Sequence, residues 1–111
     1  METTVGSYEA GQIQLLSRSG STTISIHWPF DRETDEWVDL NLLLDDDAVR
    51  RGAAPIAASI RSGQDIFQLQ DRSDGVYALT AEGRNAVSPV SLECLLNDRD
   101  ALTILRHLSA I

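Results

Sequence analysis

The chain has 111 residues, of which 42% are hydrophobic, 23% charged and 5% aromatic. This composition predicts one globular domain, 1–111, and argues against intrinsic disorder. No apolar run approaches the roughly 20 residues of a membrane span, and the N-terminus lacks the basic and apolar regions of a signal peptide. The single cysteine, Cys94, cannot form an internal disulfide, so we expect a cytoplasmic protein in a reducing compartment.

The negative charge is concentrated in one stretch. The chain has 17 acidic residues and nine basic ones, all arginine, for a formal net charge of −8. Residues 31–47 hold eight of the acids and only Arg32 of the bases, which leaves −1 for the other 94 residues. The acids are Asp31, Glu33, Asp35, Glu36, Asp39, Asp45, Asp46 and Asp47. Phosphate repels such a stretch, so we expect no direct nucleic-acid binding and a basic surface as the complement. A solvated loop with a capped helix start is the alternative interpretation.

Alternating apolar residues predict three strands in the first half, at 12–17, 22–28 and 37–44. The first two are joined by a hairpin turn at 18–20. Pro29 lacks an N–H for a ladder hydrogen bond and is expected to end the second strand. The aspartates at 45–47 offer N-cap oxygens to a helix that starts near residue 47. Gly52 and Pro55 interrupt this helix, and Gly63 is expected to end its second piece.

The second half contains similar patterns. Strands are predicted at 65–70 and 76–80, joined through 71–75. Asp98 or Asp100 is expected to cap a final amphipathic helix at 100–109. Residues 88–97 fit two elements: a helix with Ser88 as N-cap and Pro89 in its first turn, or a strand in which positions 90, 92, 94 and 96 alternate.

Internal matches favour the strand at 88–97. Residues 13–19 and 67–73 share Gln, Leu, Arg and Ser at an offset of 54, the alternation of 38–44 matches 90–96 at 52, and 45–49 matches 98–102 at 53. These matches are short enough to arise by chance, but they indicate a tandem βββα duplication, with pseudo-repeats at about 12–62 and 65–111. The predicted class is α+β, a mostly antiparallel sheet of five to six strands with helices on one face. The matching stretch 84–100 has a net charge of only −1, so the acids of 31–47 are not needed for folding, which favours a functional role.

Motifs for catalysis and metal binding are absent from the sequence. Residues 31–35 alternate like a calcium loop, but Glu36 and Leu42 stand where that loop requires glycine and glutamate. Cys94 alternates with apolar neighbours, which predicts a buried, inert thiol with a raised pKa. His27 and His107 are expected at the surface, without the spacing of a metal site. We therefore predict no enzyme activity, no catalytic residues, no metal and no cofactor.

Residues 76–84, Val-Tyr-Ala-Leu-Thr-Ala-Glu-Gly-Arg, are similar to the wing strand of winged-helix regulators, where a Leu-Thr-x-Glu-Gly-Arg pattern leaves the wing and begins a helix. The resemblance covers nine residues. No basic recognition helix precedes it, since Arg61 is the only charge between 54 and 62. We interpret the match as a local coincidence.

The leading hypothesis is a small acidic protein-binding module that neutralises a basic protein partner, such as an immunity protein for a nuclease-type toxin. Trp28, Phe30 and Trp37 bracket the acidic stretch, and interface hot spots favour tryptophan. Trp37 is expected opposite the apolar face of its strand and partly exposed. The predicted partner-binding residues are Asp31, Glu33, Asp35, Glu36, Trp37, Asp39, Asp45, Asp46 and Asp47. Immunity proteins resemble this chain in size and charge only.

Two other hypotheses remain. Class I secretion chaperones, which bind secreted effectors, are similar in size, acidity and C-terminal amphipathic helix. They normally begin with a helix, which residues 1–11 do not indicate. The second alternative is a small enzyme or ligand-binding domain that uses the interface between the two halves.

Overall fold

The computed structural model describes residues 1–31, 33–84 and 88–111, and its elements follow the order ββββα twice. The first unit contains β1 (Glu2–Ser7), β2 (Gly11–Arg18), β3 (Ser21–Asp31), β4 (Glu36–Asp45) and α1 (Asp46–Gly52). The second contains β5 (Ala58–Ser62), β6 (Asp65–Ser73), β7 (Val76–Arg84), β8 (Pro89–Asn97) and α2 (Asp98–Ser109). The α+β class with antiparallel strands is confirmed. The prediction of five to six strands and a βββα unit is wrong, because the sheet has eight strands.

The two strands that the sequence did not predict are β1 and β5. In β1 only Val5 is buried, so its six residues show no apolar alternation. In β5 only Ala58 and Ile60 are buried. The prediction of helix up to Gly63 is wrong, because Gly63 (φ +60°) lies in the turn between β5 and β6. Strand pairing with β2 and β6, rather than local pattern, makes these two segments strands.

The second strand does not end at Pro29, since β3 continues to Asp31. The pairing of β2 with β3 reaches only to the pair Gln12–His27. Beyond His27 the strand pairs with β4 alone, so a proline there removes no ladder hydrogen bond on the open side.

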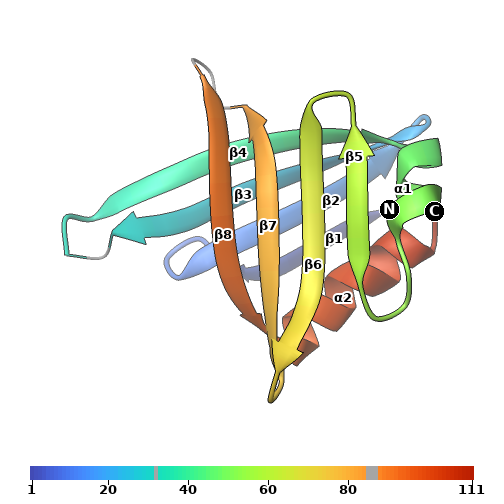
Figure 1. The fold of residues 1–111 in the computed structure, drawn as a ribbon. Coiled ribbons are helices and arrows are strands. Elements are labelled where there is room, and N and C mark those ends of the chain that lie inside the picture. The colour runs from blue at the N-terminus through green and yellow to red at the C-terminus, as the bar shows by residue number, and fades with distance from the viewer. Residues whose placement is uncertain (32, 85–87) are drawn as a thin grey trace.

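The eight strands form one curled antiparallel sheet, whose two halves are two layers with crossing strand directions. β1 to β4 run across the direction of β5 to β8 (Figure 1). β4 contacts the ends of β7, β6 and β5 in turn. Asn41 of β4 pairs with Arg84, the last residue of β7. The Leu43 N–H donates to the carboxylate of Asp65 in β6 at 2.8 Å, and the Asp45 N–H donates to the hydroxyl of Ser62 in β5 at 3.1 Å. Three successive alternate residues of β4 thus join the two layers.

Gly83 allows β4 and β7 to approach closely at this crossing. A Cβ atom at position 83 would lie 2.5 Å from Leu42 Cδ2 and 2.8 Å from the Asn41 carbonyl oxygen. Glycine within a strand often marks such an approach of two backbones.

The core lies between the inner faces of the strands and α2. Leu40, Leu42 and Leu44 of β4 are buried, as are Leu92, Cys94 and Leu96 of β8, so the alternation at an offset of 52 is confirmed and 88–97 is a strand rather than a helix. The same offset separates the helix caps: Asp45 caps α1 and Asn97 caps α2. The prediction of Asp98 or Asp100 as cap is therefore wrong. Neither described helix has the length and apolar content of a membrane span.

Candidate functional site

The nine predicted partner-binding residues occupy three separate places. Asp31, Glu33, Asp35 and Glu36 lie at the tip of the β3–β4 hairpin, Trp37 and Asp39 lie on the outer face of β4, and Asp45, Asp46 and Asp47 lie at the start of α1. From Glu36 to Asp45 the strand is about 30 Å long, at roughly 3.3 Å per residue. Residues 31–47 therefore do not form one surface. Arg32, the one base in the stretch, lies outside the described residues.

The three acids at α1 are bonded within the chain. The Asp45 carboxylate accepts the Ala48 N–H at 2.8 Å and the Ser62 hydroxyl at 2.9 Å. These hydrogen bonds hold the pKa of Asp45 below its ordinary value. Arg50 pairs with Asp47 at 3.3 Å and with Asp46 at 3.9 Å. Helix capping and local ion pairs thus account for these carboxylates.

At the hairpin tip, Asp31 and Asp35 accept hydrogen bonds within the chain, whereas Glu33 and Glu36 have no ion pair among the described residues. The Asp31 carboxylate accepts the Glu33 N–H at 2.9 Å. Asp35 adopts a left-handed conformation (φ +57°) and accepts the Trp37 Nε1–H at 3.3 Å. Glu33 and Glu36 are exposed, and no ion pair joins either to another residue that the structure describes. We define the acidic tip as residues 30, 31 and 33–36, including Phe30, which is 68% exposed.

The β3–β4 hairpin, which carries the acidic tip, has longer strands than its counterpart in the second unit. β3 and β4 have 11 and 10 residues, whereas β7 and β8, at the equivalent place in the second unit, have nine each. Figure 1 shows the β3–β4 hairpin projecting past the β5–β8 layer. The described pairing of β7 with β8 runs from Arg84–Pro89 to Val76–Asn97, so the paired strands of the first hairpin extend further than those of the second.

Next to the tip, an aromatic stack covers the outer face of the first layer. The His27 ring lies parallel to Tyr8 (centroids 4.1 Å apart, 9° between planes) and to Trp37 (4.4 Å, 6°). Two rings at this separation cannot share one face, so Tyr8 and Trp37 lie on opposite faces of His27. His27 Nδ1 and Asp39 Oδ1 are 2.7 Å apart. The outward direction of His27 and the partial exposure of Trp37 are confirmed.

The stack could not be predicted in full from the sequence. The hairpin register pairs His27 with Asp39 and Pro29 with Trp37, so alternation alone places His27, Trp37 and Asp39 on one face. Tyr8, however, follows β1, a strand that the pattern does not indicate.

A cavity of about 180 Å³ lies beside the stack. Cross-strand register places its polar residues in two rows, Gln12–His27–Asp39 and Gln14–Ser25–Asn41. It is lined by Tyr8, Gln12, Gln14, Ser25, Ile26, His27, Asp39, Leu40 and Asn41. The lining contains one carboxylate, three side-chain amides and no arginine, and the carboxylate and amide oxygens can accept hydrogen bonds.

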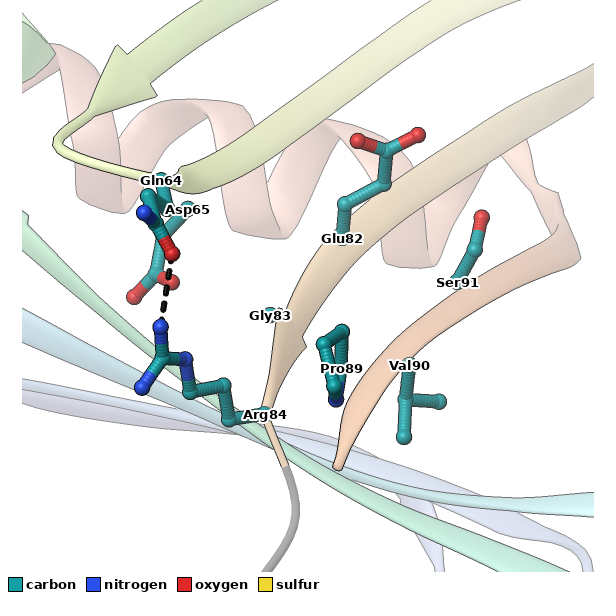
Figure 2. Close-up of a pocket in the computed structure, with 8 residues that line it drawn as sticks. All are labelled: Gln64, Asp65, Glu82, Gly83, Arg84, Pro89, Val90 and Ser91. Atoms are coloured by element: carbon teal, nitrogen blue, oxygen red, sulfur yellow. Dashed lines mark hydrogen bonds between the residues drawn. The ribbon is translucent and has the colours of Figure 1, made fainter. Parts of the chain in front are cut away.

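A second cavity, of about 220 Å³, lies at the crossing of the two layers. Figure 2 shows the Arg84 guanidinium turned toward Gln64, and its Nη2 donates to Gln64 Oε1 at 2.6 Å. The carboxylate of Asp65 holds the Leu43 N–H of β4, while Glu82 points away from Arg84 (Figure 2). The hydrogen bonds of Arg84 and Asp65 at this cavity join strands and turns of the chain to one another. We therefore assign these two side chains a structural role.

The predicted burial of Cys94 is confirmed, whereas the predicted surface position of His107 is wrong. Cys94 is buried, as predicted, and burial raises the pKa of its thiol to about 12. The prediction of a surface His107 is wrong, because its ring is buried and bonded to Thr3 and Ser17. Among the described residues, no three histidine, cysteine or acidic side chains gather closely enough to hold a metal ion.

Comparison with known proteins shows the fold alone. No family model matches the chain, and no curated protein matches its sequence. The structure is similar to a chain from the crystal structures of Trypanosoma bruciei MRP1/MRP2, with a TM-score of 0.57 and 12% identity, over 99% of this chain and 81% of that one. At this identity the likeness concerns the overall fold and nothing finer.

Proposed function

We propose that this chain is an acidic protein-binding module whose acidic tip engages a basic protein and neutralises it, as an immunity protein neutralises a nuclease-type toxin. The observation that carries the proposal is the pair Glu33 and Glu36. Both are exposed at the end of the longer, projecting hairpin, and neither is ion-paired to a residue that the structure describes.

Charge and apolar area at the tip have complementary roles. Exposed carboxylates on a projecting hairpin steer a basic partner and raise the association rate at low salt. The Phe30 ring, 68% exposed, supplies apolar area that a partner's surface can bury, and Trp37 pairs across the hairpin with the preceding residue, Pro29. An aromatic anchor within a polar rim is typical of interface hot spots.

The proposed surface is narrower than the set predicted from sequence. The proposed surface excludes Asp45, Asp46 and Asp47. The Asp45 carboxylate caps α1, and those of Asp46 and Asp47 form ion pairs with Arg50. Asp31 contributes by shaping the turn.

The test uses the product of the gene adjacent to this chain's own, since toxin and immunity genes are neighbours under this hypothesis. Binding is measured by surface plasmon resonance at low and high salt, for wild type and for the double variant Glu33→Lys with Glu36→Lys. We expect a slower association and a shallower salt dependence for the variant.

The matched control is Asp71→Lys with Glu82→Lys, which changes the net charge equally on exposed positions of β6 and β7. Equal loss of binding in both variants would show that binding depends on net charge alone, and it would contradict a specific role for the acidic tip. A neighbouring gene from a secretion operon that binds through another surface would favour the chaperone hypothesis instead.

A further inference from the structure

We propose that the cavity beside the Tyr8–His27–Trp37 stack binds the guanidinium group of an arginine side chain. Its central feature is Asp39, whose side chain is 74% exposed. Asp39 Oδ1 lies 2.7 Å from His27 Nδ1, while its Oδ2 makes no hydrogen bond to any residue that the structure describes. This leaves one carboxylate oxygen, held in place by the His27 contact, to accept a charge-assisted hydrogen bond.

The remaining polar groups of the cavity suit the same ligand. A guanidinium has five N–H donors and no acceptor. Gln14, Ser25 and Asn41 stand side by side in one cross-strand row, about 6.6 Å along the strands from the row that holds Asp39. Their amide and hydroxyl oxygens supply acceptors, and no arginine lines the cavity.

Tyr8 supplies a flat wall. One face of its ring covers His27, and the side chain is exposed, with 65% of the residue accessible. Tyr8 lines the cavity whereas Trp37 does not, so the cavity lies at the Tyr8 end of the stack. A guanidinium is planar and stacks on aromatic rings, whereas an ammonium is a compact point charge that has no flat face to stack. The ring therefore favours arginine over lysine.

The size of the cavity supports a side-chain group rather than a larger molecule. Its volume of about 180 Å³ lies below the roughly 300–1,000 Å³ of sites for drug-sized ligands. The inference rests on the proposed function for the source of the arginine, which a basic partner gripped at the acidic tip would present. Asp39 is three residues from Glu36 on β4, about 10 Å along the strand.

The experiment measures the pocket without any protein partner. N-acetyl-arginine-N-methylamide is titrated into the full chain, and the shifts of the Gln14, Ser25 and Asn41 backbone amides are followed by NMR. The citrulline derivative, of the same shape but uncharged, and the lysine derivative are titrated in parallel. We expect the arginine derivative to bind at least about tenfold more tightly than the citrulline one, as for a hydrogen bond to a charged group, and more tightly than the lysine one.

Variants locate the binding. Asp39→Asn keeps an oxygen for His27 and removes the charge, so it is expected to weaken arginine binding about tenfold or more. Asp71→Asn, on exposed β6, is the matched control and should leave binding unchanged. Tyr8→Leu should bring the arginine and lysine derivatives to equal affinity.

Two outcomes would overturn the inference: equal binding of the citrulline derivative, or no shift of the three amides with the arginine derivative. Neither bears on the acidic tip. Conversely, the double variant Glu33→Lys with Glu36→Lys should still bind the arginine derivative. The binding measurement at the cavity can therefore succeed even if the proposed function fails.

Discussion

The Thr3 hydroxyl and His107 Nδ1 lie 2.7 Å apart and connect the first strand to the last helix across 104 positions of the chain. The other ring nitrogen, Nε2, lies 2.8 Å from the Ser17 hydroxyl, which in turn contacts the Thr22 hydroxyl at 2.7 Å. β1 buries only Val5, so this polar chain, together with pairing to β2, anchors the strand. Among the described residues no buried side-chain polar atom lacks a partner.

Replacing Thr3 by valine should destabilise the protein. The substitution keeps the shape but leaves His107 Nδ1 without a partner, which costs about 1–3 kcal/mol in free energy of unfolding. Urea denaturation measures the difference. Thr4→Val, on the exposed side of the same strand, should change stability by less than about 0.5 kcal/mol, and an equal loss in both variants would contradict the assigned role.

The stability of the protein should fall at acidic pH through His107. Burial lowers the pKa of this ring below its ordinary 6.5, so the folded chain holds the neutral form while the unfolded chain takes up a proton. The resulting stabilisation is complete above pH 6.5 and is lost as the pH falls through the lower, folded value. The gap in unfolding free energy between wild type and His107→Leu should therefore narrow as the pH falls below 6.5. A constant gap would show that protonation of this ring does not affect folding.

Cys94 should contribute the opposite dependence at alkaline pH. Burial, with a smaller effect of the Glu93 charge, raises the pKa of its thiol from 9.0 to about 12. Unfolding exposes a thiol that ionises more readily, so the contribution is complete below pH 9.0 and is lost as the pH rises toward 12. Wild type and Cys94→Ala should converge over this range. In the native state at neutral pH, iodoacetamide should modify Cys94 only slowly, and rapid modification would contradict its burial.

Gly83→Ala should destabilise the crossing of the two layers. The new methyl would meet the Asn41 carbonyl oxygen at 2.8 Å, and backbone moves less easily than a flexible side chain. Overpacking of this kind costs about 1–3 kcal/mol. Thermal unfolding compares it with Ser91→Ala on the exposed side of neighbouring β8, which should leave the melting temperature nearly unchanged.

Within the acidic tip, position 35 should tolerate substitution least. Asp35 has φ +57°, which aspartate adopts more readily than arginine. Asp35→Arg should therefore lower stability by about 1 kcal/mol. Asp35→Gly relieves the backbone strain but removes the acceptor of the Trp37 Nε1–H, so it should lower stability by less than Asp35→Arg does. Glu33→Lys and Glu36→Lys should preserve the fold, which circular dichroism checks before any binding assay. Charge reversals for binding thus belong at Glu33 and Glu36 rather than at Asp35.

Local pattern was sufficient for the strands with buried alternate residues and for their turns. Ile13 and Leu15 of β2 and Phe67 and Leu69 of β6 are fully buried, at the offset of 54 that the sequence shows. The Asp45 cap and the inert Cys94 were equally predictable, because capping and burial in a strand depend on residues a few positions apart.

Contacts between distant segments decided the rest. β1 and β5 are strands because β2 and β6 pair with them, Gly83 is needed because β4 crosses β7, and His107 is buried because Thr3 and Ser17 reach it. The sequence shows that residues 31–47 are acidic. It does not show that these acids lie in three separate places: the acidic tip, the cavity at Asp39 and the N-terminus of α1. An extended strand carries residues ten positions apart to opposite ends of the molecule, and only pairing with other strands determines which side chains each end meets.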